Sequence, residues 1–239
     1  YALFMEMGTG KSKVTIDTFS YLYDSGKIDC VLIVAPKGNY MNWFNNEIPT
    51  HLPEHIKIKM ANWNAAPKKK EKIALDKVMD VSHDLRILIM NVEAFSTKKG
   101  AKFAASFVIN SRCFMVIDES TTIKNPSAQR TKNILRVGIH AKYRRILTGE
   151  PVTRSPLDLY TQCQFLNPAL LGFSSYYSFR NRYAVMINMS KGSRSFKHIV
   201  GFQRLDELSE TVKDFSYRCK KQDCLDLPDK IYQYRFVDL

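Results

Sequence analysis

The chain has 239 residues and a mass of 27.6 kDa, and its 36 Lys and Arg outnumber its 23 Asp and Glu, which gives a net charge of +13. A hydrophobic content of 45% excludes global disorder, and no apolar run approaches the roughly 20 residues that span a bilayer. Five cysteines argue against a disulfide scaffold and for a reducing compartment. The positive excess predicts an anionic partner, with nucleic acid first and an anionic membrane surface second.

Short apolar runs alternate with helix-length segments as far as residue 166. The runs are rich in Val, Ile and Leu, as in strands covered on both faces, and they are Ala2–Met5, Cys30–Ala35, Ile56–Met60, Arg86–Met90, Phe114–Ile117 and Arg145–Leu147. Helices are predicted at Lys11–Ser25, Lys68–Val81, Lys102–Asn110, Ser127–Val137 and Pro156–Leu166. Because this alternation is typical of βαβ units, we expect an α/β fold with a mainly parallel sheet and helices on both faces.

The pattern changes after Leu166. Residues 174–183 are aromatic and basic, residues 189–196 indicate an exposed loop or hairpin turn, and we predict a helix at Leu205–Phe215 and a strand at Ile231–Val237. These features predict a lobe over residues 1–170, a helical and β extension over 171–225 and a linker over 226–239. Both ends resemble strands already under way, so we expect a piece of a longer protein. The first residues lack the basic and apolar regions of a signal peptide, so we expect a protein that is not secreted.

A glycine-rich loop follows the first predicted strand and opens the first predicted helix, with the sequence Gly8-Thr9-Gly10-Lys11-Ser12. Glycines let backbone N–H groups close around a phosphate, and the helix N-terminus adds favourable partial charge. Lys11 would reach the β- and γ-phosphates, and the Ser12 hydroxyl would ligate magnesium. Met5 stands where the full phosphate-loop pattern has its first Gly. We interpret the loop as an ATP–magnesium site, the alternative being a tight turn with an exposed lysine.

Two carboxylates, Asp118 and Glu119, end the apolar strand that begins at Phe114. The carboxyl ends of parallel strands share one edge, so both should face the crevice of the phosphate loop. Asp118 would hold magnesium, and Glu119 would orient or activate the attacking water. The alternative is a solvated turn or a helix cap. A metal site at Cys219 and Cys224 is not expected, because no second Cys or His pair follows them.

The motifs together resemble the first RecA-like lobe of superfamily-two helicases, and among these the Swi/Snf-type DNA translocases. The segments that carry the resemblance are Met7–Ser12 (motif I), Ile33–Lys37 with Asn42-Trp43 (motif Ia), Ile89–Glu93 (motif Ib), Asp118–Thr121 with Ile123-Lys124-Asn125-Pro126 (motif II and its extension) and Leu147–Pro151 with Asn167-Pro168 (motif III and the segment after it). The family usually has His where this chain has Thr121, and a small polar residue where it has Glu150.

The resemblance implies a P-loop ATPase lobe whose cofactors are ATP and magnesium. Its expected partners are duplex DNA and a second RecA-like lobe, and no membrane partner is expected. It places coupling between nucleotide and DNA at Thr121, Thr148 and Gly149. It places contacts with the DNA phosphate backbone at Pro36, Lys37 and Asn91. Cytoplasmic or nucleoid-associated action follows, or nuclear action in a eukaryote.

The function implied is that of the ATP-binding lobe of a DNA-dependent ATPase that remodels DNA or protein–DNA complexes. Two alternatives stay open at this point: a strand-separating DNA or RNA helicase of the same superfamily, and a nucleotide-gated nucleic-acid-binding module without turnover. A basic nucleic-acid-binding domain with no nucleotide role is a third.

Overall fold

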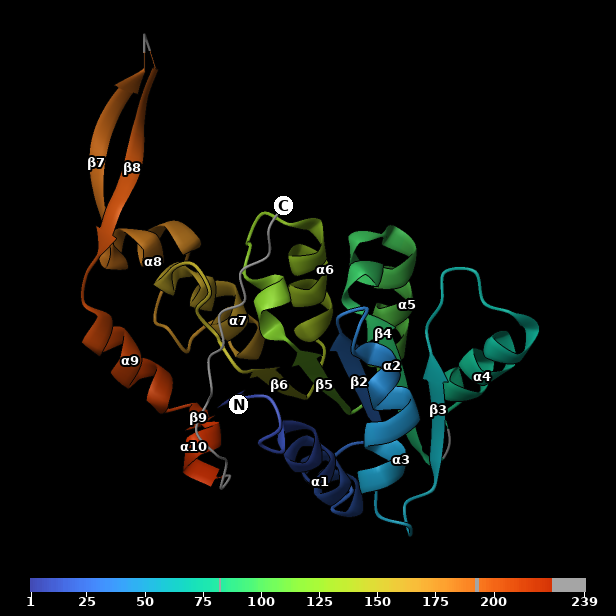
Figure 1. The fold of residues 1–239 in the computed structure, drawn as a ribbon. Coiled ribbons are helices and arrows are strands. Elements are labelled where there is room, and N and C mark those ends of the chain that lie inside the picture. Colours follow the sequence, from blue (N-terminus) through green and yellow to red (C-terminus); the bar gives the residue numbers. More distant parts are fainter. Residues whose placement is uncertain (82, 192–193, 225–239) are drawn as a thin grey trace, which may run out of the picture.

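A single parallel sheet organises the fold, as seen in the computed structural model, which describes residues 1–81, 83–191 and 194–224 (Figure 1). Within these residues seven strands pair in the order β3-β4-β2-β5-β6-β1-β9. Their bounds are β1 (Ala2–Met5), β2 (Cys30–Ala35), β3 (Ile58–Asn62), β4 (Leu85–Asn91), β5 (Cys113–Asp118), β6 (Tyr143–Thr148) and β9 (Ser216–Cys219). The predicted α/β fold with a mainly parallel sheet is confirmed.

Helices cover both faces of the sheet, because successive side chains of a strand point to opposite sides. Val31 and Ile33 of β2 join one apolar core, and Leu32 and Val34 join the other. The first core packs under α1 (Lys11–Asp24) and a helical run made of α2 (Tyr40–Asn42), a π-helical turn (Trp43–Glu47) and α3 (Ile48–His51). The second packs under α4 (Lys69–Met79), α5 (Lys98–Val108), α6 (Gln129–Gly138) and α7 (Leu159–Leu166). The expectation of a sheet covered on both sides is therefore confirmed.

Several predicted boundaries move by a few residues, and the largest shift has a local cause. Helix α5 begins at Lys98, four residues before the predicted start, because the Thr97 side chain accepts a hydrogen bond from the Gly100 N–H (3.1 Å) and caps the helix there. Gly100 also lets the helix approach the preceding turn, since a Cβ at this position would lie 2.3 Å from the Ala94 carbonyl oxygen. Strand β3 begins at Ile58, two residues after the predicted start.

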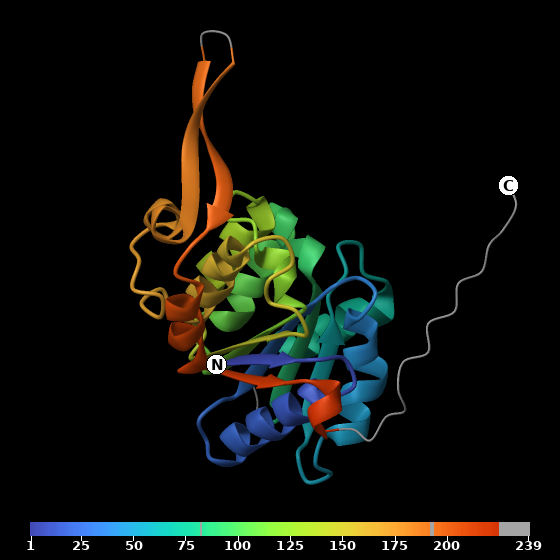
Figure 2. The ribbon, with the colours of Figure 1, turned by 60° about the vertical axis from the view of Figure 1, so that its left-hand side comes forward.

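The C-terminal part carries a hairpin that extends away from the body of the molecule (Figure 2). Its strands β7 (Ala184–Lys191) and β8 (Arg194–Phe202) pair antiparallel and follow α8 (Tyr176–Tyr183). Of the segment 189–196, expected as an exposed loop or hairpin turn, residues 189–191 and 194–196 belong to the paired strands at the tip of this hairpin. Phe179 anchors α8, since its ring packs 5.4 Å from Tyr160 and 4.9 Å from Tyr183 between ring centroids.

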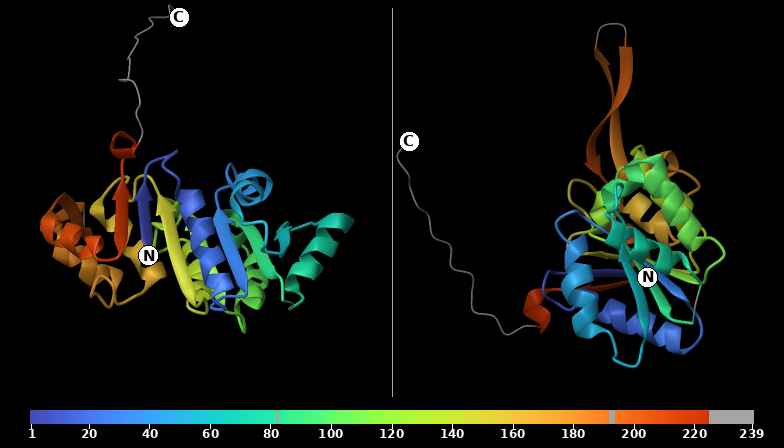
Figure 3. Two further views of the ribbon diagram at one scale, coloured as in Figure 1. Left: turned by 90° about the horizontal axis from the view of Figure 1, so that it is seen from below. Right: turned by 90° about the vertical axis from the view of Figure 1, so that its right-hand side faces the viewer.

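The chain then returns to the main sheet. Helix α9 (Leu205–Lys213) leads into β9, which pairs in parallel with β1 at the sheet edge, and the short helix α10 (Lys221–Cys224) follows (Figure 3). The segment expected as an extension therefore supplies an edge strand of the lobe's own sheet. The predicted strand at 231–237 and the linker at 226–239 lie outside the described residues.

Candidate functional site

The loop over residues 6–10 joins β1 to α1 and turns sharply. Gly8 and Gly10 adopt φ angles of +83° and +90°, which side chains disfavour, and this explains the two glycines. The Thr9 hydroxyl closes the turn by donating to the Glu6 carbonyl (2.7 Å). Lys11 Nζ donates to the carbonyls of Met5 (2.7 Å) and Glu6 (3.0 Å), so its ammonium group rests against the backbone of its own loop.

Asp118 lies at the carboxyl end of β5 and is only 4% exposed. Its Oδ2 accepts hydrogen bonds from the Trp43 indole (2.8 Å) and the Asn39 amide, and its Oδ1 accepts from the Glu119 N–H (3.0 Å). Burial raises the pKa of Asp118, while these three donors and the charge of Lys11 act against that rise. The donors fix the carboxylate in place and hold it beside the lysine.

Glu119 adopts a left-handed backbone with φ of +48°, a strained conformation for a residue with a side chain. Its carboxylate lies 3.4 Å from the Thr148 hydroxyl, at the end of β6. Burial and then the charge of Asp118 raise the pKa of Glu119, and Lys11 opposes both. Strain and a perturbed carboxyl at one position are typical of a functional site.

The predicted nucleotide residues meet at one cleft of about 650 Å³, within the size range of small-molecule sites. Its lining includes Gly8, Gly10, Lys11, Ser12, Asp118 and Glu119 from the predictions, together with Pro36, Asn39 and Asn42. The Thr9 side chain instead bonds back to Glu6 and is not among the lining residues. Asn39 and Trp43 are contacts of Asp118 that the motif spacing does not reveal.

The donor set fits magnesium bound together with phosphates. Ser12 and Asp118 offer two hard oxygen ligands, and magnesium is commonly held by one or two protein oxygens plus substrate phosphates. Across residues 1–81, 83–191 and 194–224, no group of three or more His, Cys, Asp or Glu side chains is arranged to hold a metal by itself. The cleft therefore suits a metal–nucleotide complex better than a free cation.

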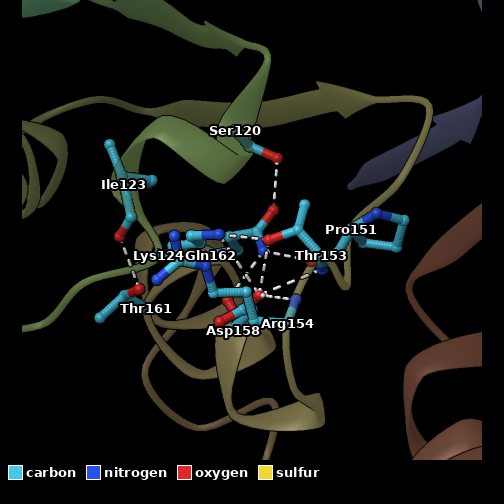
Figure 4. Close-up of polar contacts among 9 residues, drawn as sticks. All are labelled: Ser120, Ile123, Lys124, Pro151, Thr153, Arg154, Asp158, Thr161 and Gln162. Carbon is cyan, nitrogen blue, oxygen red and sulfur yellow. Dashed lines mark hydrogen bonds and ion pairs between the residues drawn. The ribbon is translucent and has the colours of Figure 1, made fainter.

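A hydrogen-bond bridge joins Ser120, the residue after the acidic pair, to the loop after β6 (Figure 4). The buried Ser120 hydroxyl donates to Gln162 Oε1 (2.6 Å), and Gln162 Nε2 donates to the carbonyls of Pro151 (2.8 Å) and Asp158 (2.7 Å). Next to it, the Thr161 hydroxyl donates to the Ile123 carbonyl (2.6 Å). Helix α7 is thus tied directly to the segment that follows Glu119.

The three predicted coupling residues differ in their contacts. Thr148 contacts Glu119, and Gly149 lies beside the phosphate loop, where an added Cβ would make an ordinary van der Waals contact with the Glu6 Cα (3.6 Å). The Thr121 side chain has no hydrogen bond to any part of the chain that the structure describes. Ser120 and Gln162 make the buried connection instead, and neither lies at a predicted coupling position.

Lys124 joins the same network from the extension of the acidic motif. Its ammonium lies 3.6 Å from Asp158 Oδ2, which also accepts from the Thr153 N–H (3.1 Å), the Thr153 hydroxyl (2.9 Å) and the Arg154 N–H (3.0 Å) (Figure 4). These donors lower the pKa of Asp158 although burial acts in the opposite direction. Asp158 therefore ties the loop over 151–158 to itself and to Lys124.

The residues predicted to contact DNA lie at the same edge of the sheet as the cleft. Pro36 and Lys37 directly follow β2, and Asn91 ends β4, which pairs with β2 so that Ala35 stands opposite Asn91. Pro36 lines the cleft and Lys37 is exposed. Asn91 Oδ1 accepts from the Glu93 N–H (3.0 Å) and caps the 3₁₀ turn that follows.

A family model for the SNF2-related domain matches residues 2–239. The chain belongs to the SNF2-related family. The INO80 chromatin-remodeling ATPase of Aspergillus terreus is 26% identical over 250 residues, covering 98% of this chain and 13% of the relative. The INO80 protein of Pyricularia oryzae is 29% identical over 238 residues, with 98% and 12% covered. The chain thus spans about an eighth of the length of these relatives.

A solved structure agrees with this assignment. The Sulfolobus solfataricus SWI2/SNF2 ATPase core in complex with dsDNA is 27% identical, with a TM-score of 0.66 over 96% of this chain and 42% of that one. The Swi/Snf resemblance predicted from the motifs is confirmed. None of the described helices combines the length and apolar character that a membrane crossing requires.

Proposed function

We propose that this SNF2-related chain is the ATP-binding lobe of a DNA-dependent ATPase that moves along duplex DNA and remodels DNA or protein–DNA complexes. One observation carries the proposal: Lys11, Ser12, Asp118 and Glu119 line a single cleft at the carboxyl edge of the sheet. Ligands of open α/β sheets bind at this edge. The names of the INO80 relatives and of the Sulfolobus ATPase core support the same class of activity.

Binding falls to the loop and to the start of α1. The backbone N–H groups at the start of α1 would face a phosphate at the helix N-terminus, where the partial charge is favourable, whereas the Thr9 N–H donates to the Glu6 carbonyl within the turn (3.3 Å). Lys11 exchanges the carbonyls of Met5 and Glu6 for the β- and γ-phosphates. Ser12 and Asp118 would hold magnesium, which neutralises phosphate charge when bound.

The two neighbouring carboxylates have different roles, since Asp118 would hold the metal and Glu119 would orient the water. Asn39 and Trp43 hold Asp118 toward the metal position. Glu119 projects from a left-handed backbone toward Thr148 and orients the attacking water. In phosphoryl transfer positioning and charge stabilisation supply most of the catalysis, so such fixed placement is what the reaction requires.

The proposed activity also requires DNA and a second lobe. Pro36, Lys37 and Asn91 lie on the edge that would face the DNA phosphate backbone, where contacts give affinity without sequence reading. A second RecA-like lobe in the same protein would supply an arginine to the transferred phosphoryl group. The whole protein would act where DNA is located, which is the nucleoid or the nucleus.

The test is DNA-stimulated ATP hydrolysis by the longer protein that carries this chain. Lys11→Ala should abolish Mg–ATP binding, and Glu119→Gln should keep binding while reducing turnover by at least about 100-fold. Equal turnover in the wild type and Glu119→Gln would favour the nucleotide-gated module. Efficient separation of duplex strands would favour the helicase alternative, because the proposed translocase moves along DNA with little strand separation.

A further inference from the structure

Two cysteines form a pair beside the phosphate loop. Cys219 is the last residue of β9 and Cys224 the last of α10, and their sulfur atoms are hydrogen-bonded at 3.5 Å. Cys219 is buried and Cys224 is exposed. The pair therefore combines an accessible thiol with a second thiol in reach. Cys30, Cys113 and Cys163 differ from it in being buried in the core.

The turn between the two cysteines is bonded to the residues that open the phosphate loop. The Glu6 N–H donates to the Cys219 carbonyl (3.0 Å), and the Lys221 N–H donates to the Glu6 carboxylate (2.9 Å). The Lys221 side chain lies against Gly8, with its Cε 4.0 Å from where a Cβ would stand. A conformational change in the turn over 219–224 would therefore act directly on residues 6–8, through these hydrogen bonds and the contact with Gly8.

We propose that Cys219 and Cys224 are a reversible oxidation site, which a small-molecule disulfide such as glutathione disulfide closes to an intramolecular disulfide. The closed form binds Mg–ATP more weakly at the adjoining phosphate loop. This second statement rests on the proposed function, because it requires the cleft to bind Mg–ATP. The two thiols are too few for a structural zinc site, which takes four ligands.

The reaction proceeds by two thiol–disulfide exchanges. The Cys224 thiolate attacks glutathione disulfide, forms a mixed disulfide and releases one glutathione. The Cys219 thiolate then attacks Cys224 Sγ and releases the second glutathione, so two thiols are oxidised, one external disulfide is reduced and the two thiol protons pass to the two glutathiones. The hydrogen bond with Cys224 and burial raise the pKa of Cys219, which favours Cys224 as the first nucleophile.

Closure should weaken nucleotide binding because the loop has to rearrange. Lys11 leaves the carbonyls of Met5 and Glu6 when it turns to the phosphates, and Glu6 is bonded to the turn at both its N–H and its carboxylate. A disulfide across the turn stiffens these anchors in their nucleotide-free arrangement. Rearrangement then costs more, and the dissociation constant rises.

The modification is tested by titrating the full chain with mixtures of reduced and oxidised glutathione. Alkylation and mass spectrometry should find Cys219 and Cys224 joined, with a mass two hydrogens lower, while Cys163 stays free. Cys224→Ser replaces an exposed thiol with a hydroxyl and should abolish the disulfide without loss of fold. Persistent free thiols at both positions, or only a mixed glutathione adduct, would overturn the site.

The consequence is tested by Mg–ATP titration of reduced and oxidised protein. We expect the dissociation constant to rise about fivefold on oxidation, and not at all in Cys224→Ser. By linkage, saturating Mg–ATP should raise the reduction potential of the pair by about 20 mV. If the disulfide forms but the reduced and oxidised proteins bind Mg–ATP with equal affinity, the proposed coupling is overturned. Absence of Mg–ATP binding to the reduced wild type instead refutes the proposed function, and the coupling with it.

Discussion

At the scale of single residues, Glu119 is held in a state that costs stability. Its folded pKa lies above the usual value, so the folded protein binds a proton more readily than the unfolded chain, and its charge destabilises the fold at neutral pH. Glu119→Gln removes that charge. We expect the melting temperature at pH 7 to rise by about 1–3 °C while turnover falls. Thermal unfolding at pH 7 and at pH 3, where the gain should vanish, checks the sign.

Trp43 is a second residue for which we expect a role in the site as well as in the core. It is 1% exposed and donates its indole N–H to Asp118. Trp43→Phe keeps much of the aromatic bulk but leaves that carboxylate with one donor fewer, which should cost about 1–3 kcal/mol and weaken magnesium-dependent ATP binding. Trp63→Phe, at a 9% exposed position away from the cleft, is the matched control. Equal magnesium dependence in both variants would contradict the role given to Trp43.

At the scale of elements, the bridge from Ser120 to Gln162 links the acidic pair to α7. Ser120→Ala removes the 2.6 Å hydrogen bond in a buried position and should destabilise the fold by about 1–2 kcal/mol. If the bridge carries coupling, stimulation of the ATPase by DNA should fall more than Mg–ATP affinity. Ser106→Ala, which removes an exposed serine of α5, should change neither quantity. A loss of affinity equal to the loss of stimulation would assign Ser120 a packing role alone.

The elements also show where sequence patterns suffice. Continuous apolar runs such as Cys30–Ala35 identify buried parallel strands, and contiguous motifs identify Gly8–Ser12 and Asp118-Glu119. Strand β9 has only four residues, two of them exposed, and it becomes a strand because it pairs with β1 at the other end of the chain. Contacts such as those of Trp43 with Asp118 are likewise long-range, so no local period encodes them.

At the scale of the whole molecule, the net charge of +13 has an expected use at the carboxyl edge of the sheet. Lys37 lies at that edge just after β2, whereas Lys27 lies at the opposite edge just before the same strand, and both are exposed. Lys37→Ala in the longer protein should lower DNA affinity and reduce the salt slope by about one phosphate's contribution, roughly 0.9. Lys27→Ala should leave the slope unchanged. Equal slopes for the two variants would contradict the placement of DNA at this edge.

The position of the cleft also bears on what the chain can do by itself. The groups proposed to bind phosphates and metal all line the cleft of this lobe, but charge on the transferred phosphoryl group is proposed to be stabilised by an arginine of a second lobe. Such an arginine contributes about 10³–10⁵ in rate. The 239-residue chain should therefore bind Mg–ATP, with loss of binding in Lys11→Ala, yet turn it over only slowly with or without DNA. Calorimetric binding and a phosphate-release assay on the same sample separate the two steps. Turnover by this chain at the rate of the longer protein would show that the cleft needs no second lobe.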